Sequence, residues 1–408
     1  MLFSLALRNS LRNRRRSLLT ATMVMLGVAS LTVAMSWIEG VFGSMVGTAS
    51  NLAGHVRVVD ADYARREQLN PLYENIVVSA PLEAAIRAVP GVIGVYPRIS
   101  MGVTATVGEE IGEEFGLVQG GPIALFEGPL ALPSHLVEGR LLADDGEVVI
   151  GKKLVEKMGA HLGDDVVLLG QTQDGSMSPA KLKLVGIVDL GNAMQNRQIF
   201  VTLDKARYMA DIPDGAVELG VYAADKSEGK ALAAQIAALS ELAGTDVKSW
   251  DQRPPFDNIV GLISTVKGVA ASAMVFITAL GVLNTMLMSV LERTGEIGVM
   301  RAMGLRRHQV VSLFVLEALG ISAIGGVLGA AFGGAGGYWL QVHGVNLGTV
   351  VDKLPASIPV NSTVYAQVTP GILVSAVLLG LSMAVVGGVI PALRASRIEP
   401  IEAMRHRR

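Results

Sequence analysis

The sequence contains no cysteine among its 408 residues, and aromatic side chains make up only 5% of it. Without cysteine the chain forms neither disulfides nor thiolate metal sites. Charged residues are also scarce, at 17%, and the formal net charge is −2. With this small net negative charge, the chain lacks the excess of basic residues that typically binds nucleic acid. The composition therefore excludes a disulfide framework and argues against nucleic acid as a partner.

Nucleotide-binding and catalytic motifs are missing as well. No G-x-x-x-x-G-K-[ST] occurs, so the chain cannot hold ATP through a P-loop. H-E-x-x-H and G-x-S-x-G are absent too, and the six histidines are scattered. His55, His135, His161 and His343 fit surface or turn positions better than a metal site. We expect no catalytic residue, no metal and no cofactor on this chain.

Long apolar runs are the main feature that is present. Half of the residues are apolar, and the mean hydropathy is +0.47. Four segments reach the roughly 18 apolar residues that a membrane-spanning helix needs. They are Ser17–Ile38, Gly268–Leu291, Val310–Trp339 and Ile372–Ile390. We predict an α-helical membrane protein with four transmembrane helices and a large α/β domain between helices 1 and 2.

Charge predicts which side of the membrane each connection occupies. Arginine recurs in the amino-terminal segment, in the connection between the second and third spans, and in the carboxyl tail. The connection between the last two spans has only Lys353 as a basic residue. Because cytoplasmic loops carry the excess of Lys and Arg, both termini and the 292–309 connection should be cytoplasmic and the large domain external.

These patterns give the following division of the chain. Residues 1–16 form a cytoplasmic basic segment, 17–40 transmembrane helix 1, 41–257 the external domain, 258–291 transmembrane helix 2 with a stalk, 292–309 a cytoplasmic connection, 310–341 transmembrane helix 3, 342–369 an external loop, 370–391 transmembrane helix 4, and 392–408 a cytoplasmic tail. Mildly apolar flanks at Glu39–Asn51 and Asp257–Lys267 favour helical extensions that lift the external domain off the bilayer.

The external domain has a split pattern. Strand and helix patterns alternate in residues 54–96 and again in 198–250. Between them, residues 97–197 are rich in strand patterns punctuated by glycine and proline, and Lys153–Met158 is the only clear helix. We expect an α/β unit interrupted by a β-rich insertion.

Small residues line one side of the third span. Gly325, Gly329, Gly333 and Gly337 are spaced by four residues, which puts them on one face of a helix. A ridge of this kind lets two helices approach closely in lipid. Glu317 is the one ionisable residue well inside a span, and a lone carboxylate argues against a proton-coupled carrier. We expect it to reach the interface or to pair with a neighbouring arginine.

The stretch Leu291–Val310, LERTGEIGVMRAMGLRRHQV, mixes charged and apolar residues between two spans. In a helix, Glu292, Glu296, Met300 and Met303 share one side, and Arg293, Ile297 and Arg301 share another. No side is purely apolar, so the stretch suits a groove on another protein better than a lipid surface. An ordinary solvated loop is the alternative interpretation.

Three motifs in order along the chain carry a family resemblance. LRNSLRNRRRSLLTATMVMLGVAS stands at the amino end, LERTGEIGVMRAMGLRRHQV between the second and third spans, and PALRASRIEPIEAMR after the last span. The chain resembles the MacB/LolC–LolE/FtsX family of type VII ABC transporter permeases over nearly its whole length. The MacB proteins carry a fused ATPase and this chain has no P-loop, which favours the LolC/LolE-like branch or a stand-alone MacB-like permease, and its build is closest to the LolC/LolE-like permeases.

The resemblance implies partners and sites. It implies a bacterial inner-membrane protein that pairs with a second permease subunit, as a homodimer or heterodimer, and with a dimer of separate LolD- or MacB-like ATPase subunits that hold ATP and Mg²⁺. Residues 54–96 and 198–250 would be Porter-like, residues 97–197 Sabre-like, and residues 292–309 the coupling helix. The ATPase-coupling residues would be Glu292, Arg293, Glu296, Ile297, Met300, Arg301 and Gly304.

The resemblance also leaves three functions open. A LolC/LolE-like permease would extract lipoproteins from the inner membrane, in contact with membrane lipid, and release them to a periplasmic carrier. A MacB-like permease would move its periplasmic domain to push cargo onward without passing it through the bilayer. An FtsX-like permease would use the same motion to regulate a cell-wall hydrolase.

Overall fold

The computed structural model describes residues 14–108, 113–192, 194–225, 228–253, 256–348 and 362–397. The predictions made for the basic segment before residue 14, for the loop residues 349–361 and for the tail after residue 397 lie outside these ranges. The chain divides into a helical unit, Met1–Gly43 with Gly261–Val345 and Val364–Arg408, and an α/β unit, Ser44–Val260 with Asn346–Thr363. Each unit is described by itself.

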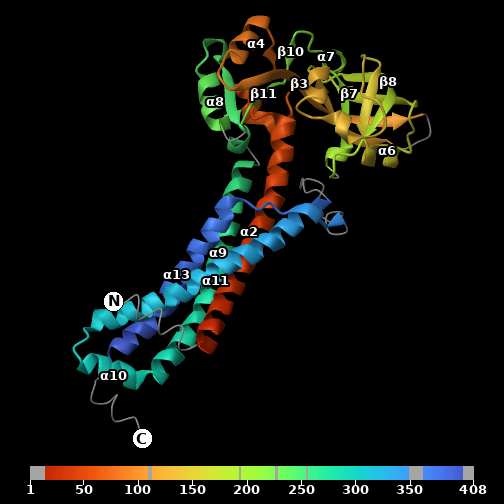
Figure 1. The fold of residues 1–408 in the computed structure, drawn as a ribbon. Coiled ribbons are helices and arrows are strands. Elements are labelled where there is room, and N and C mark those ends of the chain that lie inside the picture. The colour runs from red at the N-terminus through yellow and green to blue at the C-terminus, as the bar shows by residue number, and fades with distance from the viewer. Residues whose placement is uncertain are drawn as a thin grey trace. The chain divides into compact units, whose positions relative to one another are not determined.

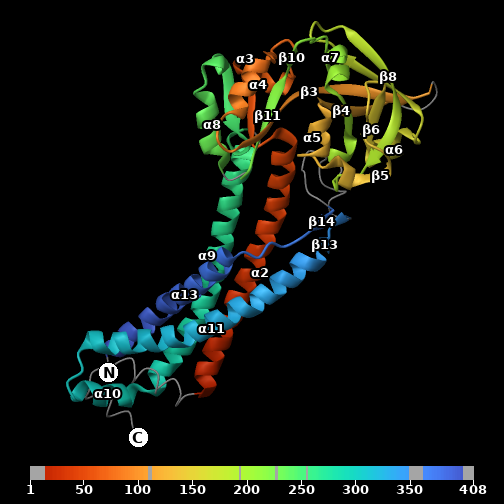
Figure 2. The same cartoon turned by 45° about the horizontal axis from the view of Figure 1, so that its top comes forward.

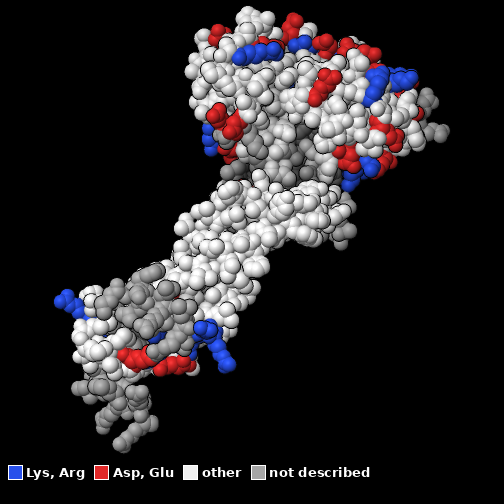
Figure 3. All heavy atoms as spheres, in the orientation of Figure 1, with Lys and Arg blue, Asp and Glu red and all other residues white. Residues whose placement is uncertain are grey.

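Five helices make up the helical unit as it is described (Figure 1). They are α2 (Arg14–Ala53), α9 (Phe256–Glu292), α10 (Thr294–Ala302), α11 (Arg307–His343) and α13 (Pro370–Ser396). Four of them contain stretches long and apolar enough to cross a membrane: Arg14–Met45, Gly261–Glu292, Arg307–His343 and Pro370–Ser396. The prediction of four spans is confirmed. On the face drawn in Figure 3, the charged residues of this unit gather at the end where α10 lies, and the rest of the helical surface is uncharged.

The glycine ridge of α11 lies directly against α2. A β-carbon added at Gly325 would come 2.6 Å from the carbonyl oxygen of Ala21. At Gly329 and Gly333 it would come 2.6 Å and 2.7 Å from the carbonyl oxygens of Met25 and Ala29. Gly337 continues the ridge against the side chains of Val368 and Ser36. Any larger residue at Gly325, Gly329 or Gly333 would therefore push the two helices apart.

Helices α9 and α13 also approach each other closely at a glycine. A β-carbon at Gly387 of α13 would come 2.7 Å from the carbonyl oxygen of Ala279 on α9. Between the helices lies a common apolar core, which consists of Val24, Val28 and Leu31 of α2, Val282 and Met286 of α9, Ala318, Ile321 and Ala330 of α11, and Ala376, Met383 and Ala384 of α13. Helices α2, α9, α11 and α13 thus form one packed bundle.

The α/β unit is built on a sheet of ten strands in the order β12-β1-β11-β3-β4-β9-β6-β8-β5, with β7 paired to β3 and β8 (Figure 2). The strands are β1 (Val56–Asp60), β3 (Val92–Val107), β4 (Glu114–Gly121), β5 (Leu136–Gly139), β6 (Glu147–Gly151), β7 (Asp165–Gln171), β8 (Met177–Val188), β9 (Gln198–Thr202), β11 (Glu218–Ala223) and β12 (Thr245–Ser249). Its helices are α3 (Ala61–Arg66), α4 (Ala80–Arg87), α5 (Ile123–Glu127), α6 (Lys152–Met158), α7 (Leu203–Ala210) and α8 (Gly229–Ala237). A small sheet of this unit pairs β2 (Ile76–Val77) with β10 (Gly215–Ala216). Elsewhere in the chain, β13 (Val345–Asn346) pairs with β14 (Thr363–Val364).

Strand β3 runs through both halves of this unit. Its first half pairs with β11, from Val92 to Arg98, and its second half pairs with β4 and then β7 up to Val107. Helices α4 and α8 cover a core around the first half, which includes Ile86 and Ile236. Most of the strands from β4 to β9 enclose a second core around its other half. One continuous strand therefore joins an α/β half to a β-rich half.

Strand β9 and helix α7 belong to the β-rich half of the unit, whereas the sequence pattern placed them in the α/β half. The sequence pattern groups residues 198–250 with 54–96, but β9 pairs in parallel with β4 and antiparallel with β6. Helix α7 follows it, with Ala206 against Gly120 of β4. The chain returns to the α/β half only at β11. An alternation of strand and helix patterns does not specify which strands pair with each other. The sequence therefore could not show at which residue the chain passes from the β-rich half back to the α/β half.

Helix α5 was not expected in the β-rich half, where Lys153–Met158 was the only predicted helix. It spans a single turn after Pro122 and buries Leu125 and Phe126. Five residues are too few for a helical period to be recognised. Helix α6 covers the predicted Lys153–Met158.

A buried network of charged side chains sits where β1, β3, β4 and β11 meet. Glu218 contacts the guanidinium of Arg57 and lies 3.4 Å from Arg98 Nε, and Arg98 donates to Gln119 at 2.8 Å. Burial alone would lower the pKa of Arg57, but the carboxylates of Glu218 and Glu67 outweigh it and raise that pKa. Buried charges are tolerated only when they are paired in this way.

Candidate functional site

The candidate site is the segment that joins α9 to α11. Helix α10, Thr294–Ala302, ends in a tight turn in which the amide of Gly304 donates to Arg301 O at 3.0 Å and that of Leu305 to Met300 O at 3.2 Å. These two bonds form a Schellman cap, which satisfies carbonyls that the helix end leaves free. Gly304 has a φ of +98°, a conformation that glycine adopts far more easily than other residues. Gly295 lies inside α10 without a positive φ.

One face of α10 is buried and the opposite face is exposed. Ile297 is fully buried and packs with Val290, Val310, Phe314, Ala392 and Ala395 from α9, α11 and α13. Arg293, just before the helix, is also buried. The opposite side carries Glu296 and the apolar side chains of Val299 and Met303, and all three are exposed, as is Glu292 at the end of α9. Met300 and Arg301 are half-buried between the two faces.

An ion-pair cluster fixes the beginning of α10. The guanidinium of Arg293 lies 3.2 Å from the Glu317 carboxylate on α11 and 3.1 Å from that of Glu296. Only 10% of the Arg293 side chain and 6% of the Glu317 side chain are exposed. Glu292 is paired with Arg16 of α2. Glu317 is therefore paired with an arginine, which is one of the two outcomes expected from the sequence. The cluster joins α2, α10 and α11.

Hydroxyl groups continue this polar cluster inward. Thr20 of α2 donates to Thr285 of α9 at 3.2 Å. Ser289 and Glu317 line a cavity of about 10 Å³ beside them, the space of a single water molecule. The cavity is too small for a substrate, so the cluster holds helices together rather than binding a ligand.

The structure thus brings together some of the residues predicted from the stretch 292–309. Glu292, Arg293 and Glu296 meet in the ion-pair cluster, Ile297 and Met300 belong to the apolar cluster beneath α10, and Gly304 makes the exit turn. The roles of Arg16 and Phe314 were not foreseen. Glu317 gave a signal for the first, because a carboxylate inside a span requires a cation near it.

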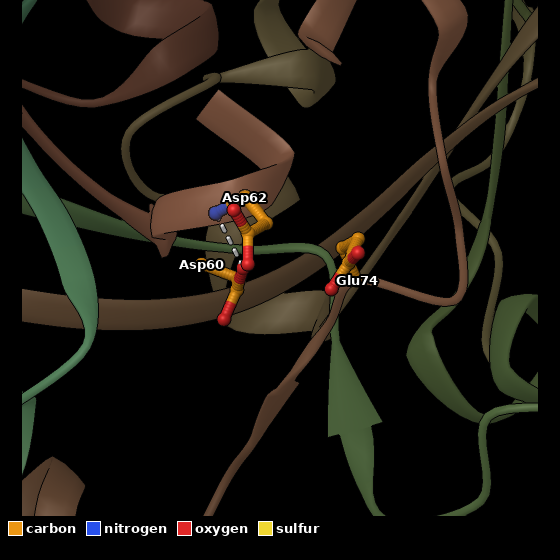
Figure 4. Close-up of side chains that lie close together, drawn as sticks. All are labelled: Asp60, Asp62 and Glu74. Carbon is orange, nitrogen blue, oxygen red and sulfur yellow. Dashed lines mark hydrogen bonds between the residues drawn. The ribbon is translucent and has the colours of Figure 1, made fainter. Parts of the chain in front are cut away.

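A group of acidic residues in the α/β unit has an ordinary explanation. Carboxylate oxygens of Asp60, Asp62 and Glu74 lie within 4.8 Å of one another (Figure 4). Asp60 caps α3 by accepting from the amides of Asp62 and Tyr63, and Asp62 pairs with Arg65 at 2.7 Å. Capping and pairing therefore account for the positions of Asp60 and Asp62 without a metal ion.

Four apolar helices with a large α/β unit between the first two define a multi-pass membrane protein. Comparison with known families makes this class specific. The model of the MacB-like periplasmic core domain matches residues 17–239, and that of the FtsX-like permease C-terminal region matches residues 268–400.

Individual relatives agree with these matches. The uncharacterized ABC transporter permease YknZ of Bacillus subtilis is 24% identical over 98% of this chain and 98% of its own length. LolC of Neisseria meningitidis, a lipoprotein-releasing system transmembrane protein, is 24% identical over 94% of this chain and 92% of its own. Among solved structures, the periplasmic region of MacB from Actinobacillus actinomycetemcomitans is 14% identical, with a TM-score of 0.35, over 50% of this chain and 92% of that one. The chain belongs to the ABC transporter permeases of the MacB/LolC/FtsX type.

Gly304 and Gly295 provide a matched pair of substitutions. Gly304→Ala should destabilise the end of α10 by about 1–2 kcal/mol, because alanine is strained at positive φ. Gly295→Ala should instead stabilise α10 by about 0.5–1 kcal/mol, since a β-carbon there meets nothing within 4 Å. Hydrogen exchange of α10 amides in the purified full-length chain measures both effects. Equal effects of the same sign would contradict the assigned turn.

The Arg293–Glu317 pair is tested by removing one or both charges. Glu317→Ala should lower the stability of the helical unit by about 3 kcal/mol, because Arg293 would then lie buried with only the exposed Glu296 as a partner. The double variant Arg293→Met with Glu317→Met should recover most of that loss, since it leaves no buried charge. Thermal unfolding in detergent compares the variants. A double variant no more stable than Glu317→Ala would refute the pairing.

Proposed function

We propose that this chain is the permease subunit of an ABC transporter whose ATP hydrolysis takes place on a separate ATPase, and that α10 is the element on which the ATPase acts. The observation that carries the proposal is that one face of α10 is buried against the bundle and the other is exposed. Arg293 and Ile297 fasten it to the bundle, while Glu296, Val299 and Met303 are exposed.

The proposal needs α10 on the side of the membrane where ATP is available. The arginines flanking the spans favour the cytoplasm for this end of the helical unit, with both termini there and the α/β unit in the periplasm. Because the sequence has no P-loop, ATP and Mg²⁺ would be held by the partner. An inner-membrane location and a second permease subunit beside this one belong to the same proposal.

The ion-pair cluster supplies a path for the motion. A push on the exposed face of α10 reaches α11 through Arg293 and Glu317, and reaches α2 through Glu292 and Arg16. Helix α2 continues past its apolar segment to Ala53, into the α/β unit. Movement at α10 would therefore reach α2, a single helix of 40 residues.

For the cargo, we propose lipoproteins extracted from the inner membrane and passed to a periplasmic carrier. The similarity to LolC over 94% of the chain supports this choice. A second candidate is mechanical export of the MacB type, in which the α/β unit pushes periplasmic cargo onward. The match of the MacB-like periplasmic core domain to residues 17–239 favours it.

The ATPase contact is tested on the exposed face of α10. Met303→Asp alters a side chain that is 72% exposed, and Glu296→Lys reverses a charge on the same face. Each should lower the recovery of a P-loop ATPase with the tagged chain from its native membrane by about tenfold, as for the loss of one central interface residue.

Met177→Asp serves as the matched control, because Met177 is 61% exposed in the α/β unit and should leave recovery unchanged. Mass spectrometry must identify the P-loop in the recovered protein. Undiminished recovery with Met303→Asp and Glu296→Lys, together with normal coupled ATPase activity, would count against the assignment of α10.

The cargo is tested with one lipoprotein in two forms. The purified complex should bind the acylated form at least about tenfold more tightly than the unacylated form, because each buried methylene adds about 0.8 kcal/mol of binding. Equal and negligible binding of both forms would refute lipoprotein extraction and favour the mechanical exporter.

A further inference from the structure

A groove on the helical unit, separate from α10, has the features of a lipid site. It is about 250 Å³ in volume and lies between α2, α9 and α13. Its apolar lining comes from Leu31 and Met35 of α2, Ala271 of α9, and Ile372, Ala376 and Leu379 of α13. The volume is below the roughly 300–1,000 Å³ of pockets that enclose whole small molecules. It suits one alkyl chain.

The groove lies at one edge of the apolar band. The apolar run of α2 ends at Ile38 and that of α9 begins at Gly268, so Glu39 and Lys267 stand just beyond the two runs. Lys267 also lines the groove and is paired with Glu39. Charged residues at this position lie at the level of the lipid headgroups, and the apolar lining lies at the level of the acyl chains.

The charges at the mouth restrict the headgroup. An isolated lysine there would favour an anionic lipid, but the carboxylate of Glu39 cancels its charge. An ammonium group has three donors, so Lys267 can hold a phosphate as well as Glu39. The Glu39 side chain is 38% exposed and can accept from an amine. This pair of groups matches a headgroup that carries a phosphate and an ammonium together.

We propose that this groove binds one acyl chain of a zwitterionic aminophospholipid of the phosphatidylethanolamine class, with Lys267 at its phosphate and Glu39 at its ammonium. A lipid in this position fills the space between α2, α9 and α13 where side chains leave it open. The residues of the groove are different from those of α10. It makes the bundle sensitive to the lipid composition of its membrane.

Gly268 offers a way to fill the groove without disturbing the protein. It lines the groove, and a β-carbon there meets nothing within 4 Å. Gly268→Leu should occupy the space of the acyl chain. Gly320→Leu is the matched control, because Gly320 is exposed on α11 outside the groove and its β-carbon also meets nothing within 4 Å.

The experiment uses the full-length chain in nanodiscs with equal amounts of phosphatidylethanolamine and phosphatidylglycerol. Lipid that stays bound after detergent extraction is measured by native mass spectrometry. The unmodified chain and Gly320→Leu should retain phosphatidylethanolamine preferentially. Gly268→Leu should reduce that retention by at least about tenfold, because each excluded methylene is worth about fourfold in binding.

Glu39→Gln tests the headgroup separately. With Lys267 left as the single charge at the mouth, retention should shift towards phosphatidylglycerol by about fivefold. Equal retention of both lipids by the unmodified chain, or no effect of Gly268→Leu, would overturn the site. Loss of self-association in Gly268→Leu with lipid retention unchanged would show that a second copy covers the groove, and would overturn it too.

Discussion

Helices inside a bilayer gain nothing from hydrophobic attraction, so their arrangement depends on how closely their backbones can approach. Here that approach is made by α11 against α2, where three glycines leave room for the carbonyl oxygens of Ala21, Met25 and Ala29. The contact sets the position of α2, and α2 in turn presents Arg16 to Glu292. The ion-pair cluster at α10 and the groove beside Leu31 both depend on this placement.

The chain has few charged residues, and each buried carboxylate discussed above lies next to an arginine that neutralises it. Glu317 is buried inside a span because Arg293 meets it there, and the same arginine is what fastens α10. Glu218 has the same relation to Arg57 and Arg98 in the α/β unit. In both units a buried carboxylate paired with arginine joins elements that are distant in sequence, so each cluster specifies a tertiary contact that apolar packing alone would not specify.

The sequence predicts the features that repeat and misses those that depend on a single partner. Four apolar runs and the four-residue spacing from Gly325 to Gly337 can be recognised without a structure, because each follows the period of a helix. The pairing of β9 with β4 could not be, since its five residues fit any buried strand. For α10, the sequence showed two mixed faces, but only the packing of Ile297 in one cluster with Phe314 decides which face is buried. The Porter- and Sabre-like names and the individual coupling roles stay predictions.

Strand β3 has a consequence for how the α/β unit is constructed. It is hydrogen-bonded along its length from Val92 to Val107, first to β11 and then to β4 and β7. A hinge between the two cores would have to break this ladder in the middle of a strand. The β-rich half is consequently not a removable insert: excising it would cut β3 in two and deprive the α/β half of the strand that continues its own sheet.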